Sequence, residues 1–221
     1  MCFESCALLK NAIKTFSAKA RGALNSIWRP LTALKIEKMS LRKNLFNALV
    51  RSVLFYAIPA WLNIDRDNLE TIQNAFFKKL LSLRRETPSC IIHKETESEP
   101  LKIKAFEYLL NYWHRILSAE NSTLLKQAYL MQLKDIDRIP LNCAAHLKNT
   151  LNKLGFSFIW LEQSTFLLSQ YKTEIIKRLL DHELNIDKTK LDNLLNFDHY
   201  KYFQTRDIQP TLLDKKVPFH I

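Results

Sequence analysis

Two short motifs pair a cysteine with a histidine three positions later, a spacing found among zinc ligands. They are Cys90–His93 and Cys143–His146, and the four side chains would in principle make a Cys2His2 zinc site. However, 49 residues lie between His93 and Cys143, and the second pair has apolar neighbours on both sides. Buried cysteines commonly behave as small hydrophobic residues. The sequence leaves zinc binding open and favours buried cysteines over a metal site.

Carboxylate pairs are the other candidate for chemistry, because two-metal nucleotidyl transfer needs clustered aspartates. No two aspartates are adjacent here, and the nearest pairs are Asp65 with Asp67 and Asp135 with Asp137. Each pair lies where a helix cap or a turn is expected, and those roles suit aspartate well. With two glycines in 221 residues, the sequence also excludes glycine-rich phosphate loops and the Gly-x-Ser-x-Gly nucleophile elbow. We therefore expect no enzyme, no metal and no cofactor in this chain on its own.

Basic side chains form the functional pattern that remains. The net charge is +11, and residues 1–51 hold 10 Lys/Arg against 2 Asp/Glu. Such a segment suits a nucleic-acid backbone, although a solvated surface can have the same composition. The predicted nucleic-acid-binding residues lie on the polar faces of two predicted helices and around the turn between them: Lys10, Lys14, Arg21, Lys38, Arg42, Lys43 and Arg51. Phosphate contacts carry little sequence information, so we predict low specificity among RNA, DNA and hybrid duplexes. Tyr56 and Trp61 could stack on bases, but their apolar surroundings favour the core.

Helices are expected to position these residues, because apolar side chains recur at helical spacing and scarce glycine disfavours tight hairpins. The predicted helices cover residues 7–28, 41–57, 65–83, 98–117, 121–134, 142–154, 164–185 and 187–195. We expect Pro30 to mark the end of the first helix, and Asn142 and Gly155 to cap the sixth. In the second helix, the residues predicted to face the core are a stripe of Leu41, Leu45, Leu49, Val53 and Ala57, widened by Phe46, Val50, Leu54 and Trp61. The predicted fold class is all-α.

The predicted domain boundary is the polar, proline-ended stretch 135–140, which separates a helical domain over residues 1–134 from a smaller helical region over 135–221. The longest apolar run, residues 50–62, is interrupted by Arg51 and Pro59 and is too short to span a bilayer. No segment resembles a signal peptide. We therefore expect an intracellular protein of the nucleus or cytoplasm with no membrane partner, and the oligomeric state stays open.

Several sequence blocks, taken in order, resemble the region after the polymerase palm in LINE-type (non-LTR) retrotransposon reverse transcriptases. They cover most of the chain: 18–31, 56–61, 73–80, 87–88, Glu95, 100–101, 155–160 and 178–181. Ala57 stands where the family usually has glycine. The resemblance implies a helical thumb that holds the template–primer duplex, followed by a helical C-terminal region. It also implies duplex grip by Lys43 and Arg51 foremost, and no catalysis, because the palm Asp-Asp motif and the endonuclease are missing from this chain.

Two functions of different classes follow from the sequence. The first is a nucleic-acid-binding remnant of such a reverse transcriptase, an RNA-directed DNA polymerase, without its palm active site. The alternative is a non-catalytic helical interaction protein, or the product of a decayed reading frame with no selected function. Binding to duplexes with a steep dependence on salt would favour the first function. Stable folding without affinity for nucleic acid would favour the second.

Overall fold

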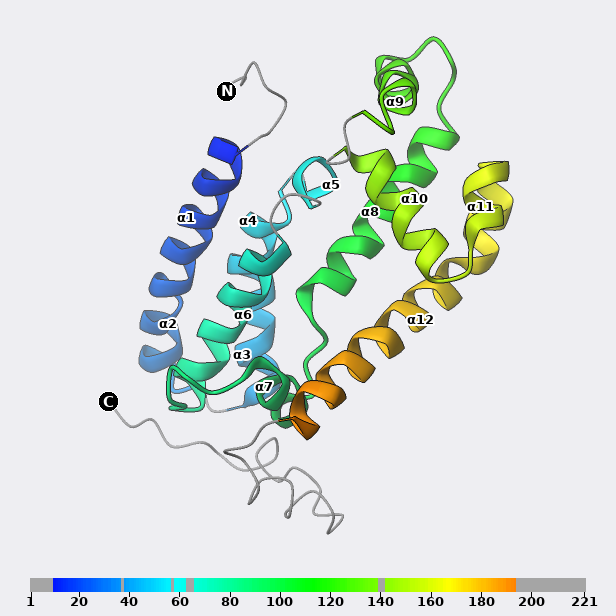
Figure 1. Ribbon diagram of the computed structural model, residues 1–221. Helices are drawn as coiled ribbons and strands as arrows, with labels where there is room; N and C mark the ends of the chain where they lie inside the picture. Colours follow the sequence, from blue (N-terminus) through cyan, green and yellow to red (C-terminus); the bar gives the residue numbers. More distant parts are fainter. Residues whose placement is uncertain (1–9, 37, 57, 63–65, 139–141, 194–221) are drawn as a thin grey trace. The chain divides into compact units, whose positions relative to one another are not determined.

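The computed structural model describes residues 10–36, 38–56, 58–62, 66–138 and 142–193, and the regular structure within these ranges is entirely helical (Figure 1). This confirms the all-α fold class. The chain divides into two compact units. Unit 1 consists of residues 1–15, 55–67 and 101–181, and unit 2 of residues 16–54, 68–100 and 182–221. The units interleave along the chain, whereas the sequence predicts a single boundary after residue 134; that boundary stays a prediction about which pieces fold alone.

Unit 2 is built from the first half of the chain and the last turns of a long helix. Its helices, some shared with unit 1, are α1 (Lys10–Ser26), α2 (Trp28–Ala33), α3 (Met39–Phe46), the π-helical turn η1 (Asn47–Arg51), α4 (Ser52–Leu54), α6 (Arg66–Leu80), α7 (Ser89–Thr96) and the end of α12 (Thr165–Asp192). Helix α1 ends at Ser26, two residues before the predicted end at residue 28, and Pro30 lies in the first turn of the next helix, α2. Backbone N–H groups in the first turn of a helix have no intrahelical hydrogen-bond partner, so the N–H that proline lacks is not needed there.

The helical segment formed by α3, η1 and α4 turns a different face to the core than the leucine pattern predicts. Phe46, Val50 and Leu54 are buried as predicted. By contrast, Leu41 and Leu49 of the predicted stripe are 49% and 44% exposed, and Arg42 is buried. The sequence predicts Arg42 as an exposed phosphate contact at the turn between two helices. A buried charge, in contrast, needs a partner. The structure supplies one, since the Arg42 Nε donates a hydrogen bond to the Ile36 carbonyl oxygen at 2.6 Å. The π-helical turn η1 also contains more residues than an α-helical turn. Residues after it therefore lie on a different face from the one that counting 3.6 residues per turn predicts.

Unit 1 is organised around α8. Its helices are α5 (Ile58–Trp61), α8 (Leu101–Leu117), α9 (Leu124–Lys134), α10 (Cys143–Lys153), α11 (Ser157–Glu162) and the first part of α12. Helix α8 packs against α5 and α9, and α10 packs against α5, α9 and α11. Trp113 of α8 is fully buried, stacks on Trp160 at 5.7 Å between ring centroids, and donates its indole N–H to the Tyr129 hydroxyl at 3.0 Å. One tryptophan thus ties three helices together.

The predicted ends of α10 are confirmed. The Asn142 side-chain oxygen accepts a hydrogen bond from the Ala145 N–H at 2.6 Å, as an N-cap does. Gly155 has φ +81°, and the next N–H, of Phe156, bonds the Leu151 carbonyl at 2.8 Å. This is the Schellman arrangement at a helix C-terminus. By contrast, the predicted break between residues 185 and 187 is wrong, because α12 is one continuous helix there.

Helix α7 was not predicted, and its C-terminal end explains why. It stops at Glu97, which has a left-handed φ of +47°. Three other non-glycine residues among those described also have positive φ: Lys35, Ser82 and Gln163. Glycine or asparagine at such positions is the usual signal for a helix end. With two glycines in the chain, other residue types take these positions and leave no signal in the sequence.

Gly155 allows a direct test of this helix end. We expect Gly155→Ala to lower the free energy of unfolding by about 1 kcal/mol, because an alanine strains the left-handed conformation. The added Cβ would lie 3.6 Å from Arg178 Nη1, an ordinary contact, so the φ angle alone accounts for the loss. The matched control is Gly22→Ala in the middle of α1, where the added Cβ would meet no atom within 4 Å beyond the helix's own backbone. Because alanine has the higher helix propensity, this variant should be more stable by roughly 0.5–1 kcal/mol. Urea unfolding of both variants measures the difference, and equal shifts would contradict the assignment.

Candidate nucleic-acid interface

The predicted basic residues divide into exposed and enclosed ones. Lys14, Arg21 and Lys38 are exposed, and Arg51 is half-buried in η1. The side chain of Lys10, the first residue of α1, lies outside the described part of the chain. Lys10 and Lys14 fall in unit 1 and the other predicted residues in unit 2. Three of the seven predicted residues are thus described as lying on an open surface.

Arg42 and Lys43 require correction. Arg42 is 1% exposed, so in this conformation it cannot meet a phosphate, and we remove it from the surface set. Lys43 is half-buried: its Nζ donates to the Thr96 carbonyl oxygen of α7 and lies 5.8 Å from the centroid of the Phe77 ring of α6. Burial lowers the pKa of Lys43, against an opposing effect of Glu97. The face of α3 that was predicted to be polar is thus packed against other helices. On this face, Lys43 connects α3 with α6 and α7.

A group of exposed cations lies around α2 and the end of α6. Of its members, the sequence points only to Arg29, as one of the basic residues around the turn between the first two predicted helices. We call Arg29, Lys79, Arg84 and Arg85 the basic cluster; all four side chains are exposed. The Lys79 Nζ lies 4.7 Å from the centroid of the Trp28 ring, which brings α2 and α6 together at this point. Lys78 donates to the Arg85 carbonyl oxygen at 2.6 Å and holds the turn after α6 against the helix end.

The charge balance around the basic cluster is strongly positive. Residues 16–54 and 68–100 of unit 2 together hold 13 Lys/Arg against 6 Asp/Glu, a balance of +7. None of the ion pairs formed among the described residues involves a member of the basic cluster. The sequence signal was present as the pairs Lys78–Lys79 and Arg84–Arg85. The first pair also suits a helix C-terminus, where cations are favourable, and the second suits a charged loop before a proline.

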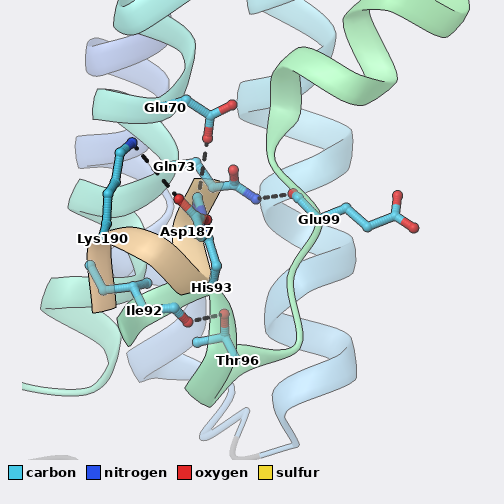
Figure 2. A network of polar contacts seen from close by, with 8 residues as sticks. All are labelled: Glu70, Gln73, Ile92, His93, Thr96, Glu99, Asp187 and Lys190. Carbon is cyan, nitrogen blue, oxygen red and sulfur yellow. Dashed lines mark hydrogen bonds and ion pairs between the residues drawn. The ribbon is translucent and has the colours of Figure 1, made fainter. Parts of the chain in front are cut away.

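A second polar site in unit 2 is buried and centred on His93 of α7, which is 9% exposed (Figure 2). Its Nδ1 lies 2.9 Å from the Asp187 carboxylate of α12, and its Nε2 lies 3.5 Å from the Glu70 carboxylate of α6. Lys190 Nζ lies 3.9 Å from the other oxygen of Asp187. In Figure 2, Gln73 lies beside this group and donates to the Glu99 carbonyl oxygen at 3.1 Å. One imidazole thus links three helices of unit 2.

The His93 group does not form a nucleophilic centre. A cavity of about 260 Å³ lies next to it, and Cys90 and Asp187 are among its lining residues. Burial raises the pKa of the Cys90 thiol, and Asp187 adds to this effect, so the protonated and poorly nucleophilic form is favoured. Both ring nitrogens of His93 face carboxylates instead of the thiol. We assign this cluster to the packing of unit 2.

The protonation of His93 gives a prediction for stability. Burial alone would lower the pKa of His93, but the nearby carboxylates of Glu70 and Asp187, the second hydrogen-bonded to the ring, outweigh it and raise the pKa. Stability from the imidazolium is therefore fully present below about pH 6.5, the unfolded value, and lost as pH rises through the higher folded pKa. We expect His93→Gln to lower the free energy of unfolding by about 2 kcal/mol at pH 6 and by less at pH 9.

Urea unfolding at a series of pH values measures this effect. His182→Gln is the matched control, because His182 is exposed on α12, and it should change stability by less than about 0.5 kcal/mol. A loss from His93→Gln that is the same at pH 6 and pH 9 would show that His93 acts as a neutral packing residue.

The two cysteine–histidine pairs of the sequence analysis fall in different units, Cys90–His93 in unit 2 and Cys143–His146 in unit 1. His146 is buried and packs edge-on against Phe106 at 5.8 Å, and burial raises the pKa of Cys143 to about 12. Within the part of the chain that the structure describes, no three or more His, Cys, Asp or Glu side chains gather as a metal site requires. The geometry therefore adds no support for zinc.

Two further observations bear on function. No helix among the described residues is both long and apolar enough to cross a bilayer. Comparison of the chain with protein-family models, with curated proteins and with solved structures gave no match. A functional proposal must therefore rest on the residues and geometry above, together with the block-wise sequence resemblance.

Proposed function

We propose that this chain binds nucleic-acid duplexes with low sequence specificity and carries no catalytic activity of its own. The observation that carries the proposal is the basic cluster: four exposed cations of unit 2, none in an ion pair among the described residues. One of them, Lys79, lies over a half-exposed tryptophan. Exposed arginine and lysine side chains neutralise phosphates and release counterions, which is the main source of non-specific affinity for nucleic acid. A balance of +7 in the surrounding segments supports the same function.

The resemblance to LINE-type reverse transcriptases suggests a role for this binding. We propose that the chain corresponds to the thumb and the following helical region of such an RNA-directed DNA polymerase, where it would hold the template–primer duplex. Lys14, Arg21 and Lys38 remain candidate phosphate contacts because all three are exposed. The basic cluster replaces Lys43 and Arg51 as the proposed centre of the grip, because Lys43 is engaged inside unit 2 and Arg51 is half-buried in η1.

Fluorescence anisotropy of labelled blunt duplexes tests the proposal. The full chain should bind DNA duplex and RNA–DNA hybrid with similar affinity, and the binding should weaken steeply with salt. Stable folding without measurable affinity for either duplex would refute it.

An alternative function, a helical protein that binds another protein, is favoured by one observation. Leu124 and Met131 of α9 are 85% and 66% exposed, and their spacing of seven residues puts them on one helix face. Exposed apolar side chains on one face are typical of protein-binding surfaces. If the chain functions by binding another protein through α9, the double variant Leu124→Glu with Met131→Glu should abolish complex formation in sedimentation velocity. Its affinity for nucleic acid should stay unchanged.

A further inference from the structure

The aromatic side chains under the basic cluster form a series that runs from the core of unit 2 to its surface. Phe46 stacks on Phe76 at 4.7 Å between centroids, and Phe76 stacks on Trp28 at 5.7 Å, with 28° between the planes in both pairs. Phe46 and Phe76 are 3% and 0% exposed, whereas Trp28 is half-exposed. Trp28 is therefore the outer ring of this series, and buried neighbours fix its position.

One cation lies over this outer ring, and three more lie close to it or to the end of α6 along the chain. Lys79 Nζ lies over the Trp28 ring, 4.7 Å from its centroid, in a cation–π contact. A base that stacks on this face displaces the flexible, exposed Lys79 side chain toward its own phosphates. Arg29 is the next residue along the chain, and Arg84 and Arg85 lie on the turn that Lys78 holds to the end of α6. An aromatic surface with positive charges beside it is how proteins bind unpaired nucleotides, since the base stacks on the ring and its phosphates meet the cations.

We propose that Trp28 is a stacking platform for an unpaired nucleobase, and that the basic cluster holds the phosphates next to that base. The ligand class is a nucleic acid with a single-stranded end beside its duplex. In a closed duplex the bases are stacked on one another and unavailable to the ring, so blunt duplex would use the phosphate contacts alone. This inference rests on the proposed function. It adds a preference for unpaired bases, which phosphate contacts alone cannot give.

The sequence offers two other aromatic residues, Tyr56 and Trp61, as candidates for stacking on bases. The prediction that Tyr56 lies in the core is wrong, because it is 60% exposed. The side chain of Trp61 lies outside the described part of the chain. Tyr56 belongs to unit 1 and not to the unit that carries the basic cluster. It therefore makes a matched control: an exposed aromatic side chain without these four cations in its unit.

The test compares three labelled DNA probes with the same duplex: blunt, with a single-stranded overhang, and with an overhang of equal length made of abasic sites. The abasic overhang keeps the phosphates and removes the bases. We expect the full chain to bind the base-bearing overhang about tenfold more tightly than the abasic one. Trp28→Ala should remove this difference, whereas Tyr56→Ala should retain it.

The outcomes separate this inference from the proposed function. Equal affinity of the wild-type chain for both overhangs, with blunt-duplex binding intact, would overturn the stacking platform alone. A preference that survives Trp28→Ala would also overturn it. Absence of binding to any probe would overturn both proposals. Should Trp28→Ala fail to fold, Trp28→Phe keeps a ring on Phe76 and is expected to retain most of the preference; its complete loss in a folded Trp28→Phe variant would contradict simple stacking.

Discussion

Replacing Arg84 and Arg85 together with glutamate is expected to weaken duplex binding roughly a hundredfold at ~0.1 M salt, because two phosphate contacts are lost. The slope of log affinity against log salt should become less negative by about 2, since each contact on B-form DNA contributes about 0.9. Both side chains are exposed on a turn, so the substitutions should leave folding intact. Anisotropy titrations at several salt concentrations measure both quantities.

The matched control for this charge reversal is Lys153→Glu with Lys177→Glu. Both lysines are exposed in unit 1, outside the basic cluster, and the change in net charge is the same. We expect this variant to bind duplex within a few fold of the wild type, with a similar salt slope. If both double variants lose affinity equally, binding depends on overall charge and the basic cluster has no special role.

Trp113→Ala is expected to be the most destabilising single substitution considered, lowering the free energy of unfolding by about 3–5 kcal/mol. Trp113 is 0% exposed, and its removal leaves a cavity beside Trp160 and takes away the donor to the Tyr129 hydroxyl. Trp113→Phe should cost less, because it keeps an aromatic ring and loses mainly the hydrogen bond.

Urea unfolding of the Trp113 variants, with Leu161→Ala as the surface control, measures this prediction. Leu161 is 79% exposed, so its truncation should change stability by less than about 0.5 kcal/mol. A loss below about 1 kcal/mol for Trp113→Ala would show that α8 is not the centre of unit 1.

The sequence was sufficient to predict features that depend on neighbouring residues. Apolar spacing predicts the helix that became α8, including the buried Leu109 and Trp113. The capping side chain of Asn142 and the left-handed Gly155 are also local, so both ends of α10 were predictable. Helix α7 was not, because Glu97 ends it without a recognisable stop residue.

Features that depend on distant contacts were not predictable from the sequence. His93 lies 94 positions from Asp187, and no periodicity links the two. Arg42 was predicted to lie on the surface because nothing in the sequence marks its partner. That partner is the Ile36 carbonyl oxygen, and every residue type has such a backbone atom. The same limit applies to the candidate site: basic charge was predictable, but whether a given cation faces solvent, as Arg84 does, or a neighbouring helix, as Lys43 does, depends on packing.

The measurement that tests the central claim most directly is the salt dependence of duplex binding by the unmodified chain. If the exposed cations of unit 2 bind phosphates, log affinity should fall linearly with log salt, with a slope of about −3 or steeper, as at least three or four phosphate contacts require. A slope near zero, or no binding to DNA duplex or RNA–DNA hybrid at low salt by a folded chain, would contradict the account.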